Sequence, residues 1–176
     1  MIPIDDLLSE QTRIRDESVD AILRDRKSVI RELIPLIDPA NREKYSDETR
    51  CAAAYLLGEL RAVEAVPFLS EALADPPGRK FGSDGSRYDV PVFSALVKIG
   101  RPAVPAMIKN VETSDDLKLR KNSLDVLNHV LGGKRRLLEL LARLNARATD
   151  PDAARHIGEA RSWCQSHYKE DEEPLY

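Results

Sequence analysis

Basic side chains are concentrated in one part of this sequence, residues 118–147. The segment holds eight lysines and arginines against two acids, a local balance of +6, whereas the whole chain of 176 residues has a net charge of −3. The basic residues are Lys118, Arg120, Lys121, Lys134, Arg135, Arg136, Arg143 and Arg147, and the acids are Asp125 and Glu139. Because guanidinium and ammonium groups bind carboxylates and phosphates, this segment is a candidate contact region for an anionic partner.

The second half of this segment is amphipathic, and its arginines share one face. At helical spacing from Lys134, the leucines at 137, 140, 141 and 144 lie on one side, and the other side carries Arg136, Glu139, Arg143 and Arg147. Three interpretations fit this basic stripe: a solubilising face, a groove for an acidic protein segment, or a nucleic-acid contact. Nucleic acid is favoured least, because phosphate binding calls for a more basic domain and base stacking for more aromatic residues.

A second candidate contact region is the loop at 75–89, which lies between two apolar segments. It carries Arg79, Lys80, Phe81, Arg87 and Tyr88, and arginines and aromatics often anchor protein partners. Its glycines at 78, 82 and 85 do not match a phosphate-binding fingerprint, and we expect no strand before it. The loop is therefore predicted to be a partner-binding insertion or a spacer between two repeats.

The sequence predicts no cofactor, metal or catalytic site. Cys51 and Cys164 lack a Cys-x-x-Cys spacing, and Cys51 is expected to pack as a small apolar residue. His156, Cys164 and His167 are too few, and unsuitably spaced, for a zinc site. His129 lies on an apolar-patterned helix, and no Ser/His/Asp arrangement accompanies it. These observations favour an interaction role over an enzymatic one.

The elements that position these residues repeat along the chain. Segments 53–60 and 94–100 are apolar helical stripes, and each is followed by an Ala-Val-Pro tripeptide, at 65–67 and 103–105. Pro67 and Pro105 are expected in the first turn of a second helix, where the missing amide hydrogen has no intrahelical partner. Pro35, 32 residues before Pro67, is expected to mark an earlier copy. Segments 124–131 and 137–144 form a degenerate fourth pair.

One motif resembles the short HEAT repeat of the phycocyanobilin-lyase type: Arg50-x-x-Ala53-Ala54-x-x-Leu57-Gly58-x-Leu60, then Glu64-Ala65-Val66-Pro67-x-Leu69. The resemblance is close over 49–74, extends to 90–111, and is only architectural at 15–38 and 119–148. It implies an all-α, right-handed α-solenoid of about four HEAT-like helix pairs that binds macromolecules along a concave face lined by the second helices. The motif carries no catalytic residue, and a chromophore-lyase-like activity would rest on the family name alone.

Length and composition fit a single domain. With 42% hydrophobic and 32% charged residues, the chain is neither disordered nor membrane-spanning, and its start lacks the features of a signal peptide. We therefore expect a cytoplasmic protein without membrane contacts. Residues 1–168 are assigned to the solenoid domain, with capping helices within 4–24 and at 151–168, and residues 169–176 to an acidic flexible tail.

Together these features predict a non-catalytic scaffold or adaptor that binds another protein. The predicted contact residues are Arg120, Lys121, Arg136, Arg143 and Arg147 of the basic segment and Arg79, Lys80, Phe81, Arg87 and Tyr88 of the loop. The alternative from another class is a nucleic-acid-binding or DNA-repair protein in which the arginines contact phosphates.

Overall fold

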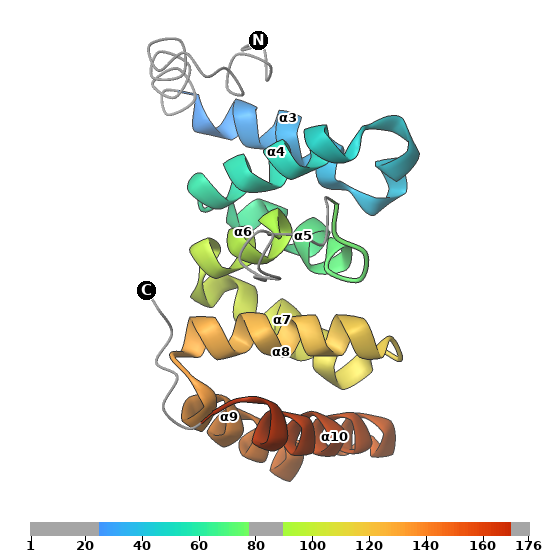
Figure 1. Cartoon of the computed structure of the whole chain (residues 1–176), viewed down its shortest axis with the longest axis vertical. Coiled ribbons are helices and arrows are strands. Elements are labelled where there is room, and N and C mark those ends of the chain that lie inside the picture. The colour runs from blue at the N-terminus through green and yellow to red at the C-terminus, as the bar shows by residue number, and fades with distance from the viewer. Residues whose placement is uncertain (1–24, 78–89, 170–176) are drawn as a thin grey trace.

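The computed structural model describes residues 25–77 and 90–169, and these residues form helices that pack in pairs without any strand. Figure 1 shows the helices following one another along the long axis of the molecule. In chain order the elements, with η for 3-10 helices, are α3 (Arg26–Ile37), η1 (Pro39–Lys44), α4 (Asp47–Glu59), η2 (Val63–Ala65), α5 (Val66–Ala72), α6 (Pro91–Ile99), η4 (Arg101–Ala103), α7 (Val104–Thr113), α8 (Leu117–Leu131), α9 (Lys134–Arg147) and α10 (Pro151–His167). The predicted N-terminal cap and segment 170–176 lie outside the described residues.

The two Ala-Val-Pro segments begin helices, as predicted. Pro67 and Pro105 are each the second residue of their helix, α5 and α7, where no intrahelical hydrogen bond is lost. The predicted apolar stripes are buried: Leu57 of α4 and Leu96 of α6 are fully inaccessible. The expected last pair is present as α8 and α9, and the expected C-terminal helix as α10.

Pro35 does not mark a helix start as Pro67 and Pro105 do, and the earlier copy predicted at 15–38 begins outside the described residues. Helix α3 begins at Arg26, and Pro35 lies in its last turn. The helix ends at Ile37 because Asp38 precedes Pro39, and a residue before proline is disfavoured in the α conformation. The Asp38 side chain instead accepts a hydrogen bond from the Ala40 amide and begins η1.

The first helices of neighbouring pairs approach most closely where α4 meets α6. A Cβ atom on Gly58 would lie 2.7 Å from the Cα atom of Ala95, so only glycine fits at this crossing. At the edge of the same contact, Lys98 of α6 pairs with Glu59 of α4 and lies 4.8 Å from the centroid of the Tyr55 ring. The bond from Lys98 also lowers the pKa of the Glu59 carboxyl.

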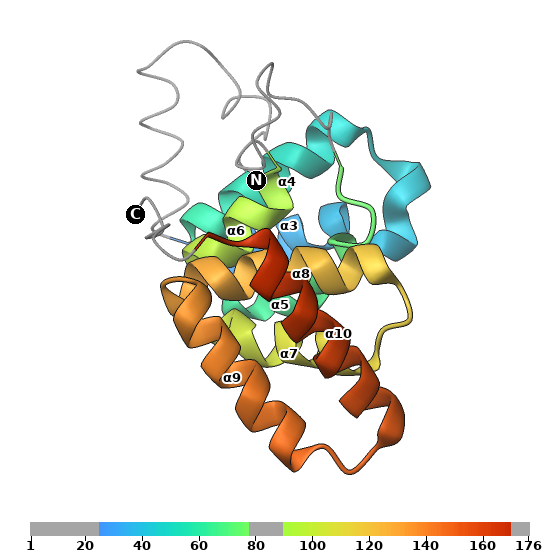
Figure 2. The same cartoon turned by 60° about the horizontal axis from the view of Figure 1, so that its bottom comes forward.

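The described pairs stack with like helices in contact until the last pair. Helix α4 packs on α6, α6 on α8, and α5 on α7. Helix α10 then packs on both α9 and α7, and Figure 2 shows α9 and α10 as two long helices at the same end of the molecule. This end is where the stacking departs from the simple repeat.

We expect Gly58→Ala to destabilise the fold, because the added methyl group meets the backbone of α6. Overpacking of this kind costs about 1–3 kcal/mol in the free energy of unfolding, which urea denaturation would measure. Gly158→Ala is the matched control, since nothing lies within 4 Å of a Cβ on that exposed glycine of α10. The control should be stabilised by about 0.5–1 kcal/mol through helix propensity, and equal effects in both variants would contradict the close approach.

Candidate functional site

Helix α10 is fixed against α7 and α8 by two buried polar side chains. His156 of α10 is 2% exposed, and its Nδ1 donates to the Glu112 carbonyl oxygen at 3.0 Å. Arg120 of α8 is 7% exposed and donates from Nη2 to Glu159 Oε2 of α10 and from Nη1 to the Ser114 carbonyl oxygen, both at 2.8 Å. These contacts hold α10 across the connection between α7 and α8.

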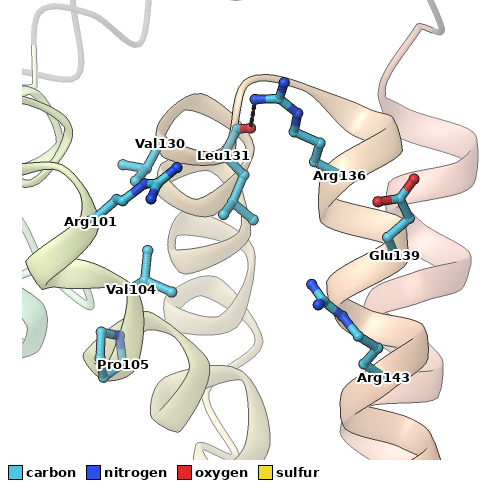
Figure 3. A pocket seen from close by; sticks show the side chains of 8 residues that line it. All are labelled: Arg101, Val104, Pro105, Val130, Leu131, Arg136, Glu139 and Arg143. Atoms are coloured by element: carbon cyan, nitrogen blue, oxygen red, sulfur yellow. Dashed lines mark hydrogen bonds between the residues drawn. The ribbon is translucent and has the colours of Figure 1, made fainter.

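A groove separates α9 from the start of α7. In the described residues α9 packs on α8 and α10 and has no extensive contact with α7, because α10 occupies much of the adjacent surface of α7. The resulting space has a volume of about 600 Å³. Its apolar lining consists of Val104, Pro105, Val130 and Leu131, and its charged lining of Arg101, Arg136, Glu139 and Arg143. Figure 3 shows these side chains on the facing walls.

Arg136 is positioned at one end of the groove by the end of α8. Its Nη1 donates to the Leu131 carbonyl oxygen at 3.1 Å, which satisfies a terminal backbone acceptor of that helix. Gly132 makes this possible, since its φ of +82° ends α8 in the left-handed conformation and a Cβ there would lie 3.0 Å from Nη1. This hydrogen bond holds the Arg136 guanidinium in place, and the remaining N–H groups of the guanidinium are available to a ligand.

Arg101 and Arg143 face the groove from opposite walls. Arg101 belongs to η4 and Arg143 to α9, and both side chains point into the space between them (Figure 3). Both residues are exposed, and neither forms an ion pair within residues 25–77 and 90–169. Glu139 lies between Arg136 and Arg143 along α9 and is likewise exposed. The groove therefore has a local charge of +2, from three arginines and one glutamate.

The predicted basic stripe on α9 is present, but the structure brings only part of the predicted contact residues together. Arg136 and Arg143 line the groove, whereas the exposed Arg147 lies on α9 beyond the lining residues. Lys121 lies 5.6 Å from the centroid of the Trp163 ring of α10. Arg120 is buried in its contacts with α10 and is not available to a partner. The loop residues Arg79, Lys80, Phe81, Arg87 and Tyr88 lie outside the described residues.

The sequence patterns did not predict that the pair α6/α7 contributes to the groove. Arg101, Val104 and Pro105 come from the turn between α6 and α7 and from the first turn of α7. The available signal was an arginine directly before the segment 102–105, which contains the second Ala-Val-Pro; this arginine places a charge at the start of a second helix. The position of Arg101 opposite α9 depends on how α10 packs on α7 and α9, and no local sequence pattern indicates that packing.

The cysteines and histidines do not form a site in the described residues, where no group of three potential metal ligands comes together. Cys164 is buried, and burial raises the pKa of its thiol to about 12, with a smaller contribution from Asp125. Cys51 is only half-buried, and burial together with Asp47 and Glu48 raises the pKa of its thiol. His167 stacks on Trp163 with ring centroids 4.3 Å apart. Among the described helices none is long and apolar enough to cross a membrane.

Comparison with known protein families matches one helix pair of the chain. Residues 49–75 are a PBS lyase HEAT-like repeat. The repeat comprises most of α4, η2 and α5, and it includes Gly58, which packs against α6. The groove lies outside the matched residues, on the two following pairs. No curated protein and no solved structure matches the chain.

We expect Arg120→Met to loosen α10 from the helices beneath it. Loss of a buried, charge-assisted contact of this kind costs about 1.5–3 kcal/mol, measurable by urea unfolding followed through Trp163, the only tryptophan of the chain. Lys121→Met is the control on the adjacent residue, which is half-buried and loses only its contact with the Trp163 ring. A loss in the control as large as that in Arg120→Met would contradict the anchoring role of Arg120.

The two thiols should differ in reactivity in the folded protein. At about pH 8 a thiol with a pKa of about 12 is almost wholly protonated, so Cys164 should not react with a disulfide reagent until the protein unfolds. The Cys51→Ser variant isolates Cys164, and Cys164→Ser isolates Cys51, whose half-buried thiol should react slowly in the native state. Rapid labelling of Cys164 in the folded protein would show that this face of α10 is not packed against the other helices.

Proposed function

We propose that the chain is a right-handed α-solenoid of about four HEAT-like helix pairs that serves as a non-catalytic scaffold or adaptor for another protein. The stacking of like helices, α4 on α6 on α8 and α5 on α7, supports a solenoid. The PBS lyase HEAT-like repeat at 49–75 supports the same architecture. In such a stack, function depends on the exposed residues rather than on the fold.

The observation that carries the proposed function is that Arg101 and Arg143 point into one groove from opposite walls, without an ion-pair partner among residues 25–77 and 90–169. On α10, by comparison, the exposed Arg155 is paired with Asp152 and Glu159. In the groove, η4 and α9 instead direct guanidinium groups into one space. The floor of this space is apolar and consists of Val104, Pro105, Val130 and Leu131. This arrangement favours a bound partner, since arginine is enriched in the contacts that dominate protein interfaces.

The buried core residues behind both walls support the same function. Arg101 follows α6 and precedes α7, whose core residues Leu96 and Met107 are fully buried, and Arg143 lies on α9 beside the fully buried Leu141. A preorganised surface loses little conformational entropy when it binds. Nucleic acid is a weaker candidate, because the groove lining includes Glu139 and no aromatic residue, and the whole chain carries a charge of −3.

Affinity capture from a lysate, with and without nuclease, tests this function. We expect a captured protein that survives nuclease and is lost with the double variant Arg101→Glu/Arg143→Glu, which reverses the charge of both walls. The control Arg147→Glu/Arg161→Glu makes the same charge change at exposed positions outside the groove and should retain the partner.

Two outcomes would contradict the proposal. Capture that disappears with nuclease would favour nucleic-acid binding. Equal loss of the partner in the groove variant and in the control would show that the partner responds to the overall charge and does not occupy the groove.

A further inference from the structure

We propose that the groove between η4–α7 and α9 binds an extended acidic peptide segment, with carboxylates on Arg101 and Arg143 and an apolar side chain on the floor between them. This inference rests on the proposed interaction function and deepens it by naming the chemistry of the bound segment. It is carried by three features of the groove: its charge, its floor and the position of its one acid.

The charge of the groove selects an anion. Arg101 and Arg143 face each other from different helix pairs, and neither has an ion-pair partner in the described part of the chain. Arginine presents a planar fork of donors that matches the two oxygens of a carboxylate. Two forks on opposite walls offer one bidentate site each, so a segment with two carboxylates can use both.

The floor of the groove favours a ligand that carries an apolar side chain between its two carboxylates. Val104 and Pro105 come from α7, and Val130 and Leu131 from the end of α8. Apart from Pro105, which is exposed, these residues are half-buried, so an apolar side chain placed on them would remove further apolar surface from water. A polyanion with phosphates at every unit would leave this floor unused.

Glu139 distinguishes a peptide from other anions. It lies on the same wall as Arg136 and Arg143 and repels any anion that spreads along the whole of α9. Its carboxylate is an acceptor for a backbone amide or a basic side chain, and a peptide carries both donors in addition to its carboxylates. Arg136 donates one hydrogen bond to the Leu131 carbonyl oxygen and adds a positive charge at the end of the groove next to α8.

Fluorescence anisotropy with a dye-labelled peptide of alternating glutamate and leucine tests the inference on the full chain. We expect saturable binding that weakens about tenfold when glutamine replaces glutamate in the peptide, and again when serine replaces leucine. Arg101→Gln and Arg143→Gln should each weaken binding by a similar factor. Arg147→Gln and Arg161→Gln remove the same charge outside the groove and should leave binding unchanged.

Several results would overturn the inference. These are an absence of peptide binding, equal weakening by Arg147→Gln, indifference to the leucines, or tighter binding of a labelled single-stranded oligonucleotide that depends on Arg101 and Arg143. Circular dichroism melting of each variant separates lost contact from lost fold, since the substituted side chains are exposed.

Failure of this inference is distinguishable from failure of the proposed function. If the peptide does not bind while the partner captured from a lysate is still lost with Arg101→Glu/Arg143→Glu, the groove binds a protein of other chemistry. If capture is also indifferent to those changes, the groove is not the interaction site at all.

Discussion

The close approach of α4 and α6 at Gly58 and Ala95 sets the spacing between the pair α4/α5 and the pair α6/α7. A Cβ on Gly58 would lie 2.7 Å from the Ala95 Cα atom, so any larger residue would push the pairs apart. Behind this contact the buried residues form one continuous core, from Ile30 of α3 to Cys164 of α10. Because neither pair can cover its own apolar face, the crossing at Gly58 is needed for both pairs to exclude water.

Polar side chains inside the stack align the second helices with the first. Asn110 of α7 donates to Ser70 of α5 at 3.0 Å and to Ser123 of α8 at 3.1 Å, and both serines are buried. Asn122 of α8 donates to the Leu73 carbonyl oxygen at the end of α5. Such bonds are directional, and leaving one partner buried and unpaired is costly. They therefore specify the alignment of pairs that apolar packing alone would allow to slide.

The groove is a consequence of breaking the repeat at its last pair. Arg120 and His156 hold α10 on α7 and α8, and α9 is left with an open side toward the start of α7. Arg120 illustrates why charge along a sequence does not identify a binding residue. It belongs to the same basic segment as Arg143, yet one is 7% exposed and paired with Glu159, and the other is exposed in the groove.

The sequence by itself determined helices α4 to α10 and the starts of α5, α7, α9 and α10. Apolar spacing and the prolines of the two Ala-Val-Pro segments act within a few residues, so they could be read locally. The position of Pro35 within its helix could not be predicted, because a proline is compatible with the last turn of a helix as well as with its first. The tertiary structure alone decided which arginines are buried and which face the groove, because those outcomes depend on contacts between distant residues, such as Arg120 and Glu159, 39 positions apart.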